Sequence, residues 1–190
     1  IINDGSNDGT KRKLKSIKNK KILIFHKKNQ GHGKTLIFGY KKAIKMKAEY
    51  IFQIDSDDQI AFNEFHKLNK YKNKYDFVCG NRLNRDDPYT RILISGFMKF
   101  IILLLYGKYI VDPNCPLRIM KTSFLKKIIN KISFSIVPNI LITISSKKGN
   151  SYKSINIKHK QRYTGSSIQF IKLYKTCVLA FLDIFKFKLS

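Results

Sequence analysis

Two acid-bearing segments stand out in a chain of 190 residues that contains only 12 aspartate and glutamate residues. The first is Asn3-Asp-Gly-Ser-Asn-Asp-Gly-Thr10 and the second is Asp55-Ser-Asp-Asp-Gln59. The second follows residues 50–54, a compact apolar run typical of a buried strand. Because ligands of open α/β sheets bind outside the carboxyl ends of the strands, this segment lies where a ligand is expected.

The alternation of Asp55 and Asp57 indicates a particular chemistry. At the end of a strand, such a pair can present two oxygen ligands to one hard cation. Magnesium or manganese held by one or two carboxylates usually takes substrate phosphates as further ligands, so a metal-bridged diphosphate is predicted. The alternative is a solvated turn, in which Asp and Ser are ordinary residues.

Two similar motifs are incomplete. The segment from Asp4 to Gly9 resembles the start of an EF-hand loop, but its twelfth position is Lys15 instead of a glutamate. The segment Gly31-His-Gly-Lys-Thr35 resembles the end of a phosphate-binding P-loop, but Lys28 occupies the position of the first glycine.

The elements that must position these segments alternate between strands and helices. Hydrophobic periodicity predicts helices at residues 11–20, 34–47 and 62–72, and strands at residues 21–26, 50–54 and 76–80. Continuous apolar strands between amphipathic helices are typical of a mostly parallel sheet covered on both faces. The predicted fold class is α/β.

The charge balance points to a polyanionic partner. Lysine and arginine number 38, which gives a formal net charge of +26. The candidate partners are nucleic acid, an anionic membrane surface and phosphorylated substrates, and a biased genomic composition is the alternative explanation. Cys79, Cys115 and Cys177 are widely spaced, so the sequence indicates neither a zinc site nor a disulfide framework, and a reducing compartment fits best.

The second half of the chain contains two dense apolar segments, residues 91–106 and 167–187. Both are too short and too interrupted by polar residues for a membrane span of about 20 residues. They either pack on the sheet or lie in a membrane interface with their lysines toward lipid phosphates. We therefore expect a catalytic domain at residues 1–165 and an amphipathic carboxyl-terminal helix at residues 166–190.

The order of the motifs resembles family 2 glycosyltransferases of the GT-A fold. The two acidic segments and Asn29-x-Gly31-x-Gly33 carry this resemblance. Four later motifs look like the branch that includes dolichyl-phosphate mannosyltransferase and other polyprenyl-phosphate glycosyltransferases: Gly80-Asn-Arg82, Arg91-x-x-x-Ser95, Asp112-Pro-Asn-Cys-Pro-Leu-Arg118 and Arg162-x-x-Gly165-x-Ser167. Family members begin with one more strand and helix. We expect that piece to be missing here, because Ile1-Ile2 reads like a strand cut midway.

The resemblance implies a donor site in the amino-terminal half. A nucleotide-sugar donor is expected to bind at Asp4, Asp8, Gly31, Gly33 and Asp55. A divalent metal, Mg²⁺ or Mn²⁺, is expected to bind at Asp55, Asp57 and Gln59.

The resemblance also implies an acceptor site for a polyprenyl phosphate. Its headgroup is expected to contact Arg91, Ser95, Arg118 and Arg162, because the guanidinium fork matches phosphate oxygens. Asp57, Asp112 and Arg82 are the expected catalytic residues. Some relatives carry an aspartate, a possible base, where this chain has Pro116. An ionised phosphate acceptor needs no base, whereas a sugar hydroxyl would need one, and Asp112 is the candidate for that role.

The expected protein is therefore an inverting, metal-dependent glycosyltransferase with a polyprenyl phosphate acceptor, peripheral on the inner, cytoplasmic face of the cytoplasmic membrane. Three alternatives remain open: a family 2 transferase with a glycan acceptor, a basic nucleic-acid-binding protein, and an inactive truncated copy. The nucleic-acid alternative is disfavoured because the acidic segments would repel phosphates and no zinc or RNP-type aromatic motif is present.

Overall fold

A computed structural model of the chain describes residues 1–83, 89–146, 151–160 and 170–189. The described strands are β1 (Ile2–Asn3), β2 (Phe25–His26), β3 (Tyr50–Gln53), β4 (Phe77–Arg82), β5 (Arg118–Lys121) and β6 (Tyr152–Ile157). The described helices are α1 (Thr10–Lys15), α2 (His32–Lys45), α3 (Phe65–Asn69), α4 (Tyr89–Tyr106), α5 (Thr122–Ile128), α6 (Pro138–Ser146) and α7 (Phe170–Leu189). A short 3₁₀ turn, η1 (Phe62–Glu64), precedes α3.

The predicted α/β class is confirmed, although the sheet is mixed. Strands β3, β5, β4 and β6 form one sheet in that order, and β1 and β2 form a separate parallel pair. β4 and β6 are parallel, whereas β5 is antiparallel to both β3 and β4. Four elements have no counterpart among those predicted: β5, α5, α6 and β6.

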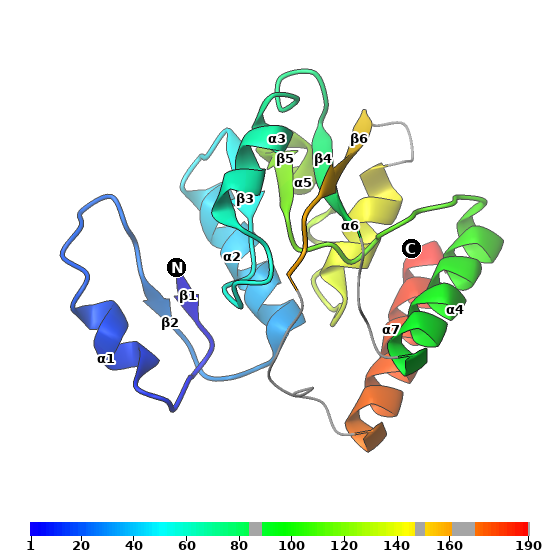
Figure 1. Cartoon of the computed structure of the whole chain (residues 1–190), viewed down its shortest axis with the longest axis horizontal. Coiled ribbons are helices and arrows are strands. Elements are labelled where there is room, and N and C mark those ends of the chain that lie inside the picture. The colour runs from blue at the N-terminus through cyan, green and yellow to red at the C-terminus, as the bar shows by residue number, and fades with distance from the viewer. Residues whose placement is uncertain (84–88, 147–150, 161–169, 190) are drawn as a thin grey trace.

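The four-stranded sheet has a separate hydrophobic cluster on each face. Along β4, Phe77 and Cys79 belong to the larger cluster, whereas Val78 belongs to the smaller one, as expected when side chains alternate along a strand. The larger cluster includes residues of α2, α4, α5, α6 and α7, and the smaller one packs with α3. Helices therefore cover both faces of the sheet (Figure 1).

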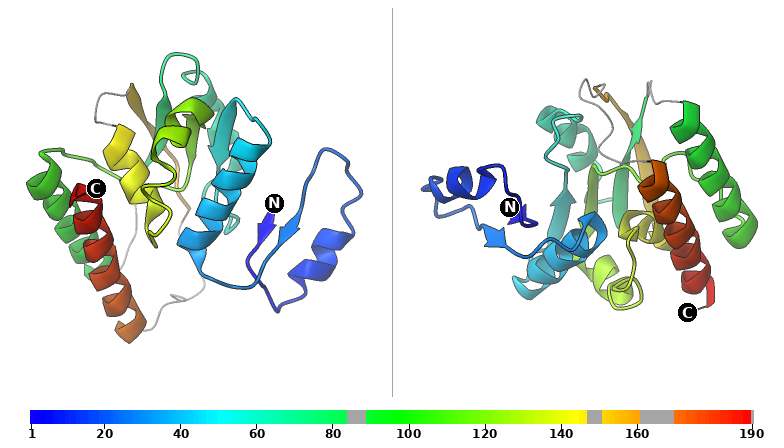
Figure 2. Two further views of the ribbon diagram at one scale, coloured as in Figure 1. Left: turned by 180° about the vertical axis from the view of Figure 1, so that it is seen from behind. Right: turned by 90° about the horizontal axis from the view of Figure 1, so that it is seen from below.

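The two apolar carboxyl-terminal segments form a pair of adjacent helices. α4 and α7 lie side by side at one end of the molecule, and β1, β2 and α1 lie at the other end (Figures 1 and 2). Tyr106 donates a hydrogen bond to the carbonyl of Ile184 at 2.7 Å, which joins the two helices. Among the described helices, none has the length and apolar character needed to cross a membrane. The helix predicted at residues 167–187 is observed from Phe170 onward, and residues 167–169 lie outside the described part of the chain.

Candidate active site

Three strands of the larger sheet end at the same edge. Since β5 is antiparallel to both β3 and β4, and β6 is parallel to β4, strands β3, β4 and β6 all run in one direction. Asp55 follows β3, Arg82 ends β4 and Lys160 follows β6. The topology thus brings together residues from three distant parts of the sequence.

Helix α2 begins at the same edge, because it precedes β3 and runs in the opposite direction. Its first residue, His32, places Nε2 at 3.3 Å from Oδ1 of Asp55. Burial by itself raises the pKa of Asp55, but the hydrogen bond with His32 and the nearby positive charges outweigh burial and hold that pKa below its ordinary value. The same hydrogen bond raises the pKa of His32. Asp55 is therefore held as a carboxylate next to the positive end of a helix dipole.

The rest of the acidic loop is open to solvent and is tied to the segment after β6. Asp57 and Asp58 are exposed, and Oδ1 of Asp57 accepts a hydrogen bond from the backbone of Gln59 at 3.3 Å. The backbone of Lys160 donates to the Gln59 carbonyl at 2.7 Å, and its ammonium group lies 3.2 Å from Asp58. Lys160 thus supplies a positive charge to this loop that no sequence motif indicated.

A polar network lies directly beneath the acidic loop. Tyr40 is buried and donates its hydroxyl to Gln53, and it lies 3.3 Å from the side-chain oxygen of Asn139. Arg118 is 0% exposed and donates to the backbone carbonyls of Cys115 and Asn139, the latter at 3.0 Å. Its positive charge also helps to lower the pKa of Asp55.

This burial corrects the expectation that Arg118 binds the acceptor phosphate. A guanidinium with no exposed surface, whose donors are engaged by main-chain oxygens, cannot receive a ligand from solvent without rearrangement of the core. Arg118 instead joins the segments of Cys115 and Asn139 and supplies a buried positive charge that acts on Asp55. The motif that ends at Arg118 therefore has a structural role at this position.

The glycine-containing loop before α2 is held in place by Asp4. The carboxylate of Asp4 accepts hydrogen bonds from the backbone of Gln30 and Gly31, at 3.2 and 3.1 Å, and forms an ion pair with Lys27. Burial acts to raise the pKa of Asp4, but the bonds from Lys27, Thr35 and the loop lower it overall. Asp4, expected to contact the donor, is thus already engaged in shaping the loop next to Asp55.

At both glycine positions of this motif, the structure explains why a larger residue would not fit. Gly31 has a φ of +88°, a conformation that side chains other than glycine rarely adopt. A Cβ atom at Gly33 would lie 2.3 Å from the carbonyl oxygen of Ile136, so α2 packs against that segment through bare backbone.

Asp8, which was also expected to bind the donor, is exposed, and its carboxylate accepts hydrogen bonds from the backbone and hydroxyl of Thr10, at 3.2 and 2.5 Å. Asp8 therefore stabilises the start of α1 in this structure.

The end of β4 carries a bidentate ion pair. Nε and one terminal nitrogen of Arg82 donate to the two carboxylate oxygens of Asp112, at 2.7 and 2.8 Å. The two side chains are 13% and 5% exposed, so the pair is largely removed from water. The backbone of Arg82 also donates to Asp112, at 3.3 Å. Both oxygens of Asp112 are thus engaged, and the guanidinium of Arg82 is fixed in orientation.

The remaining acceptor candidates are placed only in part. Ser95 lies in α4 and its hydroxyl donates to the carbonyl of Ile92 at 3.0 Å. Arg91 lies in the first part of the same helix, but its side chain is outside the described part of the structure. Arg162 lies outside the described residues altogether.

The sequence contained signals for two residues that were missed. His32 stands between Gly31 and Gly33, inside a motif already assigned to the donor. Lys160 stands two positions before Arg162. Their contacts with the acidic loop depend on tertiary pairing, so only their proximity to assigned motifs could have identified them.

A divalent cation fits this site when substrate phosphates and water complete its set of ligands. Among the described residues, no group of three or more His, Cys, Asp and Glu side chains converges on one point. Asp55, Asp57 and Gln59 offer hard oxygen atoms on a loop that is partly or fully exposed. Since magnesium-like cations are commonly held by one or two carboxylates and completed by phosphates and water, this donor set is compatible with such an ion.

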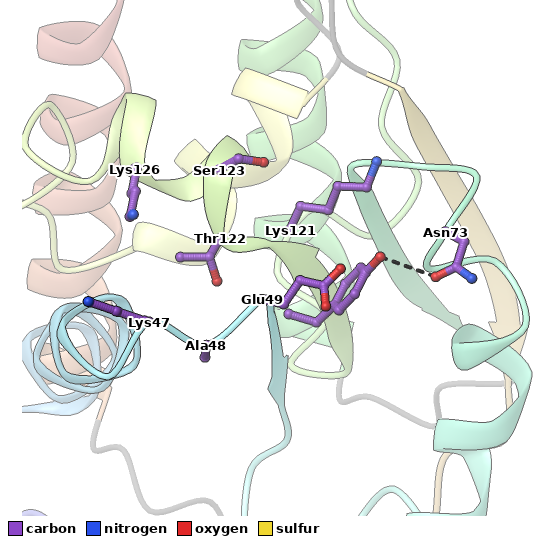
Figure 3. A pocket seen from close by; sticks show the side chains of 9 residues that line it. Lys47, Ala48, Glu49, Asn73, Lys121, Thr122, Ser123 and Lys126 are labelled. Carbon is purple, nitrogen blue, oxygen red and sulfur yellow. Dashed lines mark hydrogen bonds between the residues drawn. The ribbon is translucent and has the colours of Figure 1, made fainter.

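A cavity lies at the opposite edge of the sheet, where β3 begins and β5 ends. It has a volume of about 680 Å³ and is lined by residues that include Lys47, Lys121 and Lys126. The hydroxyl of Tyr50, which lines the cavity, donates to the side chain of Asn73 at 3.1 Å. Figure 3 shows the lysines and Asn73 around this cavity. Its lining contains a single acid, Glu49, and no glycine loop. We therefore place the active site at the edge that carries Asp55.

Comparison with known proteins identifies the class of protein to which this fold and site belong. Residues 1–134 match the model of the family described as Glycosyl transferase family 2. The match covers more than half of the chain, and the chain belongs to this family. The predicted GT-A architecture is confirmed by its structural neighbours.

Relatives and solved structures extend this similarity. An undecaprenyl-phosphate 4-deoxy-4-formamido-L-arabinose transferase of Pectobacterium atrosepticum is 26% identical over 179 residues, which cover 91% of this chain and 53% of the relative. An uncharacterized protein of Methanocaldococcus jannaschii is 28% identical over 167 residues, which cover 83% of this chain and 68% of that protein. The chain thus spans about half the length of the Pectobacterium relative.

The solved structures show that the fold is shared at low sequence identity. Glucosyl-3-phosphoglycerate synthase from Mycobacterium tuberculosis, in complex with phosphoglyceric acid, has a TM-score of 0.69 and 12% identity, covering 98% of this chain and 67% of that chain. Another structure of the same synthase holds Mn²⁺, uridine-diphosphate-glucose and phosphoglyceric acid.

Proposed function

We propose that the chain is the catalytic part of an inverting, metal-dependent glycosyltransferase that moves a sugar from a nucleotide-sugar donor to a polyprenyl phosphate. One observation carries the proposal: Asp55 and the open loop with Asp57 lie beside the glycine-containing start of α2, at the edge where Arg82 and Lys160 also lie. Acidic and basic side chains thus lie around the carboxyl ends of the strands, and transfer between two phosphate-bearing substrates requires both kinds of side chain.

The donor end of the site would be formed by the acidic loop. Asp55 and Asp57, with Gln59, would hold Mg²⁺ or Mn²⁺, and this ion would neutralise charge on the departing diphosphate. His32 orients Asp55 through its 3.3 Å contact, and the amino-terminal end of α2 adds a positive dipole near the phosphates. Asp4 keeps the glycine loop in the conformation that leaves this end of the helix accessible.

The acceptor end would lie near the end of β4. Arg82 is fixed by Asp112, which keeps its guanidinium oriented without free rotation. We assign Asp112 to this positioning role instead of to proton abstraction, because both of its oxygens accept hydrogen bonds from Arg82. A phosphate acceptor is already ionised and needs no base, so this arrangement favours a polyprenyl phosphate over a sugar hydroxyl. The candidates for binding the acceptor phosphate remain Arg91, Ser95 and Arg162.

An anionic membrane surface is the proposed location of the acceptor. The exposed stripe of α4 consists of large apolar residues at helical spacing: Ile92, Leu93, Phe97, Phe100, Leu103 and Leu104. α7 continues this surface with Val178, Leu179, Leu182 and Phe185, and it also carries Lys175, Lys186 and Lys188. Apolar area of this extent, flanked by lysines, is typical of interfacial helices that lie on anionic lipids. The membrane-facing part would thus consist of α4, within the catalytic domain of residues 1–165, and of the amphipathic carboxyl-terminal helix of residues 166–190, on the cytoplasmic face.

The deciding experiment measures transfer of radiolabelled sugar into organic-extractable lipid. Purified protein is incubated with undecaprenyl phosphate in anionic vesicles, Mn²⁺ or Mg²⁺, and a panel of nucleotide sugars. We expect labelled lipid with one donor, and loss of label with a chelator. Arg91→Ala should reduce acceptor efficiency about ten- to a hundredfold, equivalent to about 1.5–3 kcal/mol for a charge-assisted hydrogen bond, while donor binding persists. Arg91→Lys should restore only part of the loss, because lysine lacks the planar fork.

Other outcomes would redirect the assignment. Label in a water-soluble glycan would retain the transferase but reject the lipid acceptor, and Asp112 would become the residue to test as a base. Equal recovery of protein in the supernatant with and without anionic vesicles would reject the membrane surface. Salt-sensitive nucleic-acid binding without transfer from any donor would reject the enzymatic proposal.

A further inference from the structure

The one acidic residue of α7 contacts the loop that precedes α6. Asp183 is the only aspartate or glutamate in this helix. Its Oδ2 atom accepts one hydrogen bond from the Ser135 hydroxyl and another from the Ile136 backbone, both at 2.7 Å. The Ser135 hydroxyl in turn accepts a hydrogen bond from the backbone of Val137 at 2.9 Å. A single carboxylate thus fixes part of residues 133–137, which we call the α6 loop.

The α6 loop depends on this carboxylate because its polar groups are shielded from water. Ser135 is 0% exposed, and Ile136 and Val137 are half-buried. A buried donor that loses its acceptor finds little water to replace it, and an unpaired buried donor is unfavourable. Helix α7 adds a second contact, since the ammonium group of Lys186 lies 4.4 Å from the ring centroid of Phe134. The position of the α6 loop is therefore set by α7.

The α6 loop also supports the first turn of α2. A Cβ atom at Gly33 would lie 2.3 Å from the carbonyl oxygen of Ile136, so the two backbones are in direct contact. The ammonium group of Lys34 donates to the carbonyls of Ser133 and Phe134, at 3.4 and 3.3 Å. Helix α6, which follows the loop, contacts both α2 and α7 (Figure 1). The α6 loop therefore joins α7 to the start of α2.

The first turn of α2 carries a residue that contacts the acidic loop. Nε2 of His32 lies 3.3 Å from Oδ1 of Asp55. His32 directly precedes Gly33, so the packing of Gly33 on the α6 loop fixes the backbone beside His32. A continuous set of contacts thus connects Asp183 in α7 with Asp55 after β3.

From these contacts we propose that Asp183 is a positioning residue of the donor site, which holds the α6 loop and, through it, the start of α2 beside Asp55. The inference rests on the proposed function, in which a metal and a donor diphosphate bind at Asp55 and the start of α2. Displacements of about 1 Å caused by changes far from the chemistry can cost about a hundredfold in rate. Helix α7, proposed to lie on the membrane, therefore has a second role within the active site.

The alternative is that Asp183 only stabilises the fold, and Tyr106 offers a matched control for that case. Its hydroxyl donates to the carbonyl of Ile184 at 2.7 Å, so it binds α7 at the residue next to Asp183. This bond joins α7 to α4 instead of to the α6 loop. Tyr106→Phe should therefore lower the free energy of unfolding without changing the start of α2.

The test compares variants of the 190-residue chain in their affinity for uridine diphosphate with Mn²⁺, measured by calorimetry. Asp183→Leu has a similar shape but no acceptor, and it should weaken binding about tenfold. Asp183→Asn keeps an oxygen that can accept both hydrogen bonds, so it should restore affinity to within about threefold of the wild type. Ser135→Ala removes one of the two bonds and should give an intermediate loss. Tyr106→Phe should bind as the wild type does.

Hydrogen exchange without ligand provides a second measurement. The backbone of Thr35 donates to the Gly31 carbonyl at 3.1 Å, in the first turn of α2. Asp183→Leu should speed exchange of the Thr35 amide about tenfold relative to the amides of β4, and Tyr106→Phe should not. If Asp183→Leu does not fold, Ser135→Ala is compared with Tyr106→Phe in both measurements.

The outcomes distinguish this inference from the proposed function. Unchanged binding by Asp183→Leu, or equal losses in Asp183→Leu, Asp183→Asn and Tyr106→Phe, would overturn the role of Asp183 while leaving the donor site in place. Unchanged exchange at Thr35 in Asp183→Leu would overturn it too. Absence of binding by the wild-type chain would instead reject the donor site itself, and the inference with it.

Discussion

The ion pair between Arg82 and Asp112 allows a quantitative test of how the end of β4 is held. Replacing Arg82 with methionine removes two donors, at 2.7 and 2.8 Å, from a carboxylate whose side chain is only 5% exposed. Breaking a buried pair by removing one partner costs about 3–5 kcal/mol, because a buried charge loses its compensation. Arg82 is slightly more accessible, at 13%, and its backbone N–H still donates to Asp112. We therefore expect a loss near the lower limit, about 3 kcal/mol.

A double-mutant cycle separates the pair from its surroundings. The variants are Arg82→Met, Asp112→Leu and the double variant, and their free energies of unfolding are measured by urea denaturation followed by circular dichroism. Because the double variant contains no uncompensated charge, it should be less destabilised than the sum of the two single variants by about 2–3 kcal/mol. A coupling energy below about 0.5 kcal/mol would refute the argument, because two groups that do not interact give additive effects.

The other predictions concern the acidic loop, the start of α2 and the contact of α7 with the core. Asp57→Ala should abolish metal-dependent binding of uridine diphosphate in calorimetry with little effect on unfolding, because the side chain is exposed; normal binding would reject the metal assignment. Gly33→Ala should destabilise the protein by about 1–3 kcal/mol through a clash with the Ile136 carbonyl, whereas the matched control Gly96→Ala, which meets no atom within 4 Å, should be neutral or stabilising by up to about 1 kcal/mol. Asp183→Ala removes the acceptor of the Ser135 hydroxyl and the Ile136 amide, both at 2.7 Å, and should speed hydrogen exchange at Ile136 while leaving the amides of β4 protected.

Local patterns in the sequence predicted much of the first half of the fold. The helix predicted at residues 34–47 and the strand at residues 76–80 are observed as α2 (His32–Lys45) and β4 (Phe77–Arg82). Both have an apolar periodicity that neighbouring residues alone express, and this explains why they could be recognised. The helix predicted at residues 11–20 is shorter, since α1 ends at Lys15, and a run of lysines without buried apolar residues offers it no packing surface.

The carboxyl-terminal part of the sheet depended on contacts that the sequence does not express locally. β5 begins with Arg118, and a charged residue does not fit the apolar pattern by which a buried strand is recognised in a sequence. The buried guanidinium is tolerated because carbonyls of Cys115 and Asn139 accept its hydrogen bonds. Those carbonyls come from segments 3 and 21 residues away. The role of Arg118 could therefore not be predicted from the motif that contains it.

The chemistry of the site also depends partly on the sequence and partly on the tertiary structure. The sequence by itself determined which residue types are present: the acids after β3, the glycines before α2 and an excess of cations, because type and spacing are properties of the chain. Only the tertiary structure decided that His32 and Lys160 contact the acidic loop and that Asp112 is occupied by Arg82. The physical reason is that β5 runs antiparallel between β3 and β4, which brings the ends of β3, β4 and β6 to one edge, and strand order is set by packing across the whole sheet.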